Sequence, residues 1–294
     1  MHPQVLLLAS TDPSAAKQLR GWEGTAVVSV GDPHLLHHTL ASRRRHGETG
    51  PRLHDPGHRF AHVHASPFSV DPLALLPPEL VTPWAEAWRL ALWMAGGLPG
   101  MGVEHVERLR RSAHLLAPLL LAAHATQADV GVMEGWLSEL RDYANRHGTL
   151  PMQERNAETN FTATLSLLSV TDPVTREAAA AAAAVLRCPA DEPAEVLRDV
   201  RCVLAAFPSL DGLVIDRRVA QSLYGHRATL YVARPRFRPE SSNPLLLLIS
   251  ELFVEMSREP LAPPLALVLE PYLLTRLSMG LGLTPPRFAA SGWL

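Results

Sequence analysis

Glu270 is the residue that most invites a chemical interpretation, because it directly follows five apolar residues, LALVL, at 265–269. Two prolines precede that run, and the pattern predicts a short strand that is buried on both faces. In many α/β proteins, such a strand delivers a metal-holding acid at its carboxyl end, with a catalytic Glu beside it. Here Pro271 occupies the second place, and proline cannot polarise a water molecule. We therefore interpret the stretch as a strand whose acidic site is altered or vestigial.

Lys17 is the second candidate, because it lies near the end of TDPSAAKQ, which follows the apolar run VLLLAS. A phosphate-binding loop has the pattern G-x-x-x-x-G-K-[ST], in which the glycines let backbone N–H groups approach phosphate and the hydroxyl holds Mg²⁺. Aligned on Lys17, the segment has Thr11 and Ala16 at the glycine positions and Gln18 at the hydroxyl position. We expect a surface turn with a solvated lysine, or at most a vestigial nucleotide site.

Arg234, Arg236 and Arg238 form a third candidate in the Pro-rich run RPRFRP. In an extended chain, alternate residues point the same way, so three guanidinium groups would flank Phe237. Such a group could contact a phosphate backbone or an acidic partner. The alternative is a solvated loop whose arginines pair with Glu240 or with other acids nearby.

Histidines are concentrated in one part of the chain, since eight of the fourteen fall between His34 and His64. In the segment FAHVH, His62 and His64 would share one face of a strand, a spacing that can hold zinc or copper. No cysteine lies nearby, and the neighbouring Asp-Pro pairs indicate exposed turns. We expect a solvated, His-rich surface without a metal site, and a structural metal is the alternative.

The composition is that of a folded protein, because 47% of the 294 residues are hydrophobic and 19% are charged. The net charge of −2 does not favour nucleic-acid binding by the chain as a whole, so any such binding would depend on local basic patches. The chain has only two cysteines, Cys188 and Cys202, which are too few for a disulfide framework. Their number predicts that the protein occurs in a reducing cytoplasm. No basic region precedes the first apolar run, and AHLLAPLLLAAHA (113–125) is too short to span a bilayer. We therefore expect no membrane anchor.

The order of the expected elements predicts an α/β fold with a helical insertion. Strand signals occur at 5–10 and 26–30, and they return at 227–235 and 263–270. Between these two regions, the sequence has the pattern of successive amphipathic or apolar helices. The expected parts are residues 1–80 (first part of the α/β domain), 81–207 (all-α insertion) and 208–294 (remainder of the α/β domain).

A series of segments also matches a known family in order and spacing. These segments are TAVVSVGDPHLLHHTLASRRRHG, HDPGH, ASPFSVDPLA, RLRRSAHLLAPLLLAA, RATLYVARP, PLLLLISELFVEMSRE and PPLALVLE, and they extend over about residues 20 to 270. Together they resemble the conjugative coupling proteins of type IV secretion, the TraG/TraD-type DNA-transfer ATPases. The resemblance implies a RecA-like P-loop-type sheet domain that is interrupted by an all-α insertion. It also implies a hexameric ring at the cytoplasmic membrane that uses ATP to drive DNA or protein into a secretion channel.

The resemblance implies that Lys17 and Glu270 mark the family's nucleotide site, but neither motif is intact. We expect a degenerate, C-terminally shortened member that does not hydrolyse ATP, has no cofactor and serves as an accessory or recognition module in DNA or protein transfer. The alternatives are an active DNA-translocating ATPase with divergent motifs, using ATP and Mg²⁺, and a gene remnant without a role. The expected partners are type IV secretion components or a related coupling ATPase, with weak DNA binding through Arg234, Arg236 and Arg238. The expected location is the cytoplasm, at most peripheral to the inner face of the membrane through partners.

Overall fold

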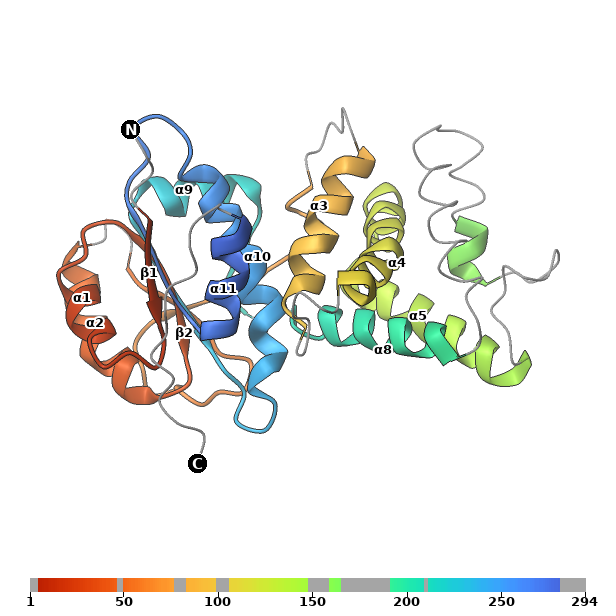
Figure 1. Cartoon of the computed structure of the whole chain (residues 1–294), viewed down its shortest axis with the longest axis horizontal. Helices are drawn as coiled ribbons and strands as arrows, with labels where there is room; N and C mark the ends of the chain where they lie inside the picture. The colour runs from red at the N-terminus through yellow and green to blue at the C-terminus, as the bar shows by residue number, and fades with distance from the viewer. Residues whose placement is uncertain are drawn as a thin grey trace. The chain divides into compact units, whose positions relative to one another are not determined.

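The chain divides into two compact units, one formed by Met1–Val70 with Pro208–Leu294 and the other by Asp71–Phe207. The sequence had placed these boundaries at 80–81 and 207–208. The computed structural model (Figure 1) describes residues 5–46, 50–76, 83–98, 106–147, 159–164, 191–208 and 211–280. The alanine run TREAAAAAAAVLR at 175–187, whose high helix propensity predicts a helix, lies outside the described residues.

The first unit contains a seven-stranded sheet in which every strand pairs in parallel with its neighbours. The spatial order is β1-β7-β2-β6-β3-β4-β5. The strands are β1 (Val5–Ala9), β2 (Thr25–Val30), β3 (Arg52–His54), β4 (Ser66–Val70), β5 (Leu213–Ile215), β6 (Thr229–Ala233) and β7 (Leu265–Leu269). The expectation of an α/β fold is therefore confirmed, with strands from both ends of the chain in one sheet.

Helices cover both faces of this sheet, which explains why its central strands are buried along their whole length rather than on one face only. All residues of β2, β6 and β7 are buried. Figure 1 shows α1 and α2 on one side of the strands and α10 and α11 on the other. The helices of this unit are α1 (Ala15–Arg20), α2 (Pro33–His46), α9 (Arg217–Gly225), α10 (Asn243–Met256) and α11 (Pro271–Gly280).

A buried arginine connects α2 to the sheet. The Arg43 residue is only 1% exposed, and its Nε donates to Thr229 Oγ1 at 2.7 Å while Nη2 donates to the Gly24 carbonyl at 2.6 Å. Its Nη1 donates to the carbonyl of Trp22. Burial lowers the pKa of Arg43, and these acceptors satisfy the guanidinium without a carboxylate. Gly24 is required in this loop, because a Cβ there would lie 1.9 Å from the Pro264 carbonyl oxygen.

The second unit is helical in its described part, with α3 (Pro83–Gly96), α4 (Val106–Thr126), α5 (Val130–His147) and α8 (Asp191–Leu204). The long helix α4 packs against α3, α5 and α8, and most of its residues from Leu109 to Ala123 are buried. Arg108 of α4 makes a bidentate contact with Asp199 of α8, at 2.7 Å from Nε and 2.6 Å from Nη2. None of the described helices is long and apolar enough to cross a membrane.

Candidate functional site

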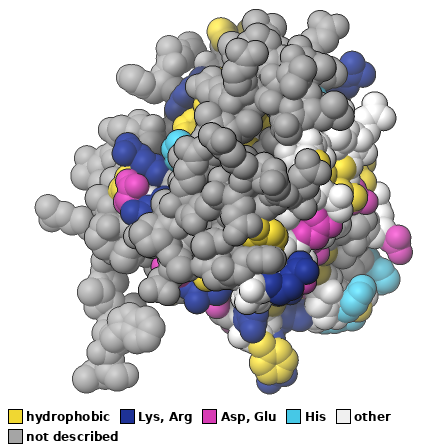
Figure 2. Space-filling model, turned by 90° about the vertical axis from the view of Figure 1, so that its right-hand side faces the viewer, with side chains coloured by type: hydrophobic (Ala, Val, Ile, Leu, Met, Phe, Trp, Pro, Cys, Tyr) yellow, Lys and Arg dark blue, Asp and Glu magenta, His cyan; other side chains and the backbone are white. Residues whose placement is uncertain are grey.

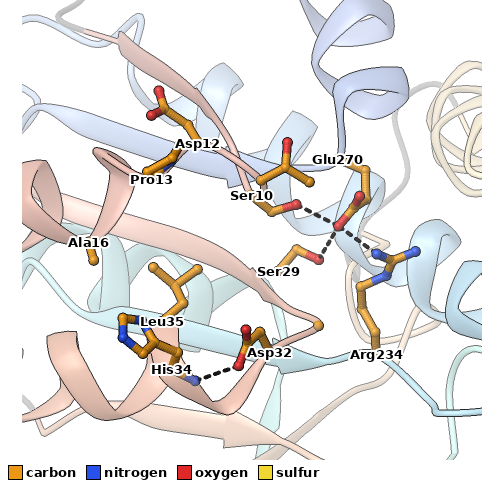
Figure 3. A pocket seen from close by; sticks show the side chains of 12 residues that line it. Ser10, Asp12, Pro13, Ala16, Ser29, Asp32, His34, Leu35, Arg234 and Glu270 are labelled. Atoms are coloured by element: carbon orange, nitrogen blue, oxygen red, sulfur yellow. Dashed lines mark hydrogen bonds and ion pairs between the residues drawn. The ribbon is translucent and has the colours of Figure 1, made fainter. Parts of the chain in front are cut away.

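A cavity of about 560 Å³ opens where β1, β7, β2 and β6 end. Its polar lining includes Ser10, Asp12, Ser29, Asp32, Arg234 and Glu270 (Figure 3). The carboxyl ends of parallel strands meet at the same edge of a sheet, and ligands of open α/β sheets bind at this edge. The cavity is therefore the leading candidate site of the first unit.

Glu270 lies at the centre of the polar contacts in this cavity (Figure 3). Its Oε1 pairs with Nη1 of Arg234 at 2.7 Å and accepts a hydrogen bond from Ser10 Oγ at 2.6 Å. A longer contact of 3.5 Å joins the same oxygen to Ser29 Oγ. The side chains of Arg234 and Glu270 are only 21% and 16% exposed. Side chains from four adjacent strands, or from the residues directly after them, thus converge on one carboxylate.

The backbone hydrogen bonds between neighbouring strands extend to the residues that carry these side chains. The Ser10 amide donates to the Leu269 carbonyl at 2.7 Å, and the Arg234 amide donates to the Val30 carbonyl at 2.9 Å. Arg59 adds a second connection, because its guanidinium donates to the carbonyls of Arg234 and Gly31, the latter at 3.2 Å. No local pattern in the sequence marks Arg59, since its acceptors are carbonyls of distant segments.

Pro271 has a structural role that the sequence analysis did not assign. It is the first residue of α11, a position that proline favours because its fixed φ suits a helix and the missing N–H has no partner there in any case. The Leu274 amide donates to the Glu270 carbonyl at 3.1 Å. The strand thus passes directly into a helix after Glu270, and Pro271 starts that helix.

Lys17 is not brought to the cavity. It lies on α1, where Ala15 and Leu19 are buried, and its own side chain is exposed. Asp12, at the cavity rim, accepts a hydrogen bond from the Ser14 amide at 2.7 Å. The segment expected to be a surface turn is thus a turn followed by a short helix. Glu270 lines the cavity, and Lys17 is not among its lining residues.

The three arginines of RPRFRP are divided between two environments. Arg234 faces the cavity and pairs with Glu270, whereas Arg236 and Arg238 are exposed on either side of Phe237, which is 92% exposed. Arg234 therefore departs from the expectation that all three guanidinium groups point the same way, because the partly buried carboxylate of Glu270 attracts it into the cavity. On the face that Figure 2 shows, acidic side chains lie among the basic ones.

The histidines of residues 34–64 also have different environments. His54 is buried, and its Nδ1 lies 3.1 Å from the Phe68 carbonyl oxygen; burial lowers the pKa of His54. The expected strand at FAHVH is a turn, because Phe60 and Val63 both enter the core and the Val63 amide donates to the Phe60 carbonyl at 2.8 Å. Within the described residues, no group of three or more His, Cys, Asp or Glu side chains is arranged to hold a metal ion.

Comparison of this chain with models of protein families, with curated proteins and with solved structures finds no match.

Proposed function

We propose that this chain is a non-hydrolysing relative of the type IV secretion coupling ATPases and serves as an accessory or recognition module in DNA or protein transfer. The order of family-like segments in the sequence supports this proposal, together with a parallel sheet whose strands come from both sides of a helical unit. In this interpretation the first unit is a RecA-like P-loop-type domain. β1 then corresponds to the strand before the phosphate loop, and β7 to the strand that carries the metal-holding acid.

The observation that carries the absence of hydrolysis is the ion pair of Glu270 with Arg234 at 2.7 Å. A metal-holding acid must offer a carboxylate oxygen to Mg²⁺. Oε1 of Glu270 already accepts from Ser10 and pairs with the guanidinium, so a metal ion would have to compete with Arg234 for this carboxylate. The positive charge of Arg234 neutralises the carboxylate in the way that a metal ion would. No second acid follows, because Pro271 begins α11.

The charges around the cavity also oppose a nucleotide. Asp12, Asp32 and Glu270 line it, and Arg234 is the cationic guanidinium among its lining residues. A triphosphate would thus meet three carboxylates against one guanidinium, and like charges repel strongly in a partly buried site. Lys17, which would contact the phosphates in the family, is exposed on α1 away from the cavity lining.

A recognition role needs a contact surface, and the segment with Arg236, Phe237 and Arg238 provides one. The three side chains are exposed, so the segment presents an aromatic ring and two guanidinium groups to solvent. Guanidinium groups pair with carboxylates and phosphates, and exposed aromatic rings stack on partner groups. An acidic surface of a coupling ATPase, or the DNA that it transfers, has the chemistry to bind there.

The test combines turnover with association, and it uses the whole chain. We expect no ATP hydrolysis, with or without single-stranded DNA, and saturable binding to an intact coupling ATPase from the same cell in sedimentation analysis. Arg236→Ala/Arg238→Ala should weaken that binding, whereas the matched control Arg20→Ala/Arg45→Ala, which removes two other exposed arginines of the same unit, should not.

Two outcomes would contradict the proposal. ATP turnover that is abolished by Glu270→Gln or Lys17→Ala would establish the active ATPase with divergent motifs. Absence of both turnover and binding to the coupling ATPase would remove the accessory role.

A further inference from the structure

Two exposed histidines from separate segments, His37 and His62, lie side by side with one ring nitrogen of each close to the other. His37 lies on α2, and His62 lies in the connection between β3 and β4. Their Nε2 atoms are 3.4 Å apart, and the two rings are nearly parallel, with centroids 5.4 Å apart. Figure 2 shows exposed His side chains (cyan) side by side on one part of the surface. Two nitrogens of the kind that binds metal ions thus lie close together at the surface.

The distance between the two nitrogens suits a shared metal ion better than a hydrogen bond. Zn²⁺ binds imidazole nitrogen at about 2.0–2.1 Å with tetrahedral angles, which separates two ligand atoms by about 3.3 Å. A hydrogen bond from an N–H group is typically about 2.9–3.0 Å long between heavy atoms. The observed 3.4 Å agrees with the ligand separation and exceeds the length of a good hydrogen bond.

The backbone around each histidine is held in place, so the pair is formed before any ion binds. Leu36, next to His37, and Val63, next to His62, are both buried in the core. The Ala65 amide donates to the Val63 carbonyl at 2.9 Å, and Arg44 of α2 donates to the His64 carbonyl. α2 and the β3–β4 connection are thereby joined beside the histidines. A preorganised pair gains affinity because little conformational freedom is lost on binding.

We propose that His37 and His62 form a two-histidine site for Zn²⁺ or a similar borderline divalent ion, with water in the remaining coordination positions. Neutral imidazole is a preferred ligand of such ions, whereas Mg²⁺ and Ca²⁺ prefer oxygen. Both side chains are exposed, so the ion enters from solvent and the open positions can accept a ligand from a partner. The bound ion links α2 to the β3–β4 connection.

The pair His34 and His38 on α2 is the internal control. These residues are four positions apart on the helix, with ring centroids 3.9 Å apart, and helical residues at this spacing can also bind a metal ion together. Their rings are tilted by 45° to each other. The proposal assigns the ion to His37 and His62 and not to this neighbouring pair.

The experiment is calorimetric titration of the tag-free whole chain with Zn²⁺, with Mg²⁺ as the comparison ion. We expect one equivalent of Zn²⁺ to bind at this site. His37→Ala and His62→Ala should each weaken binding at least about tenfold, because a single imidazole loses the effective concentration of the second. His34→Ala/His38→Ala should change the affinity by less than about twofold. Hydrogen exchange supplies an independent measurement, since Zn²⁺ should slow exchange in residues 59–65 of the unaltered chain only.

Three results would overturn the proposal. They are no Zn²⁺ binding by the unaltered chain, unchanged affinity in either His37→Ala or His62→Ala, and a loss of binding in His34→Ala/His38→Ala that matches the loss in the single variants. A circular dichroism spectrum of each variant checks that it is folded, and exposed histidines are substituted at little structural cost.

Discussion

The contact between Glu270 and Arg234 makes a measurable prediction about how the four central strands are held at their carboxyl ends. The change is a double-mutant cycle with Glu270→Gln, Arg234→Met and the variant that carries both. Glutamine keeps the shape of the side chain and removes its charge, and methionine keeps much of the apolar stem of arginine. The cycle therefore isolates the interaction between the two side chains from the individual costs of the substitutions.

The magnitude follows from the geometry and the burial. Two unit charges about 4 Å apart attract by about 4 kcal/mol at an effective dielectric constant of about 20, which is an upper bound. Removing the side chains from water offsets part of this attraction, but the two side chains keep 21% and 16% of their exposure. We expect a coupling energy of about 1–3 kcal/mol. Each single substitution should cost about 2–4 kcal/mol, because the remaining charge is left in a partly buried place.

The measurement must report on the first unit alone, because the chain has two units and global unfolding is not a two-state process. Hydrogen exchange followed by mass spectrometry gives the free energy of opening for peptides that contain β1, β2 and β7. Peptides of α4 in the other unit serve as the reference. Ser10→Ala is a further variant, and it should cost about 1–3 kcal/mol, since Ser10 donates a hydrogen bond to the charged carboxylate at 2.6 Å.

A coupling energy within experimental error of zero would refute the reasoning. It would mean that the two side chains are solvated independently and that Arg234 does not neutralise the carboxylate. Equal destabilisation of the α4 peptides would also contradict it, because the contact lies entirely within the first unit.

Two further predictions concern buried ionisable groups of the first unit. Arg43→Lys should lower the free energy of unfolding of that unit by about 2–4 kcal/mol, because one ammonium group cannot reach the separate acceptors on Trp22, Gly24 and Thr229. Arg45→Lys, at an exposed position, is the control, and similar hydrogen exchange in both variants would disprove the role of Arg43. Burial raises the pKa of Glu251 from 4.5 to about 7, against the opposing effect of Arg258 and Arg276. The folded state therefore holds this proton to higher pH than the unfolded state, so stability is lost as the pH rises from about 4.5 through 7, by about 3 kcal/mol in all. Glu251→Gln should remove that loss, with a gain at pH 8 and little change at pH 4.5, and an equal effect at both pH values would contradict the assignment.

The sequence by itself determined the elements whose signals are local. The continuous apolar runs predicted β1, β2, β6 and β7, and they occur at Val5–Ala9, Thr25–Val30, Thr229–Ala233 and Leu265–Leu269. A strand that is buried on both faces needs a continuous apolar run, and an amphipathic helix needs apolar residues that recur with the helical period. Both patterns can be recognised in the local sequence, without knowledge of which elements pack together. The strands β3 and β5 escaped prediction, because three residues each carry too little pattern. β4 escaped because its run begins with the exposed residues Ser66 and Pro67 and is not continuously apolar.

The tertiary structure alone decided which of the chemical candidates meet. Glu270 lies 260 residues from Ser10 and still accepts its hydrogen bond, because β1 and β7 are neighbours in the sheet. The same folding turned Arg234 away from Arg236 and Arg238 and brought His62 to His37 rather than to His64. Pairing of side chains depends on distance in space, and spacing along the chain predicts that distance only within a single helix or strand. The sequence could therefore indicate that Glu270 ends a buried strand, but only the packed sheet placed an arginine beside it.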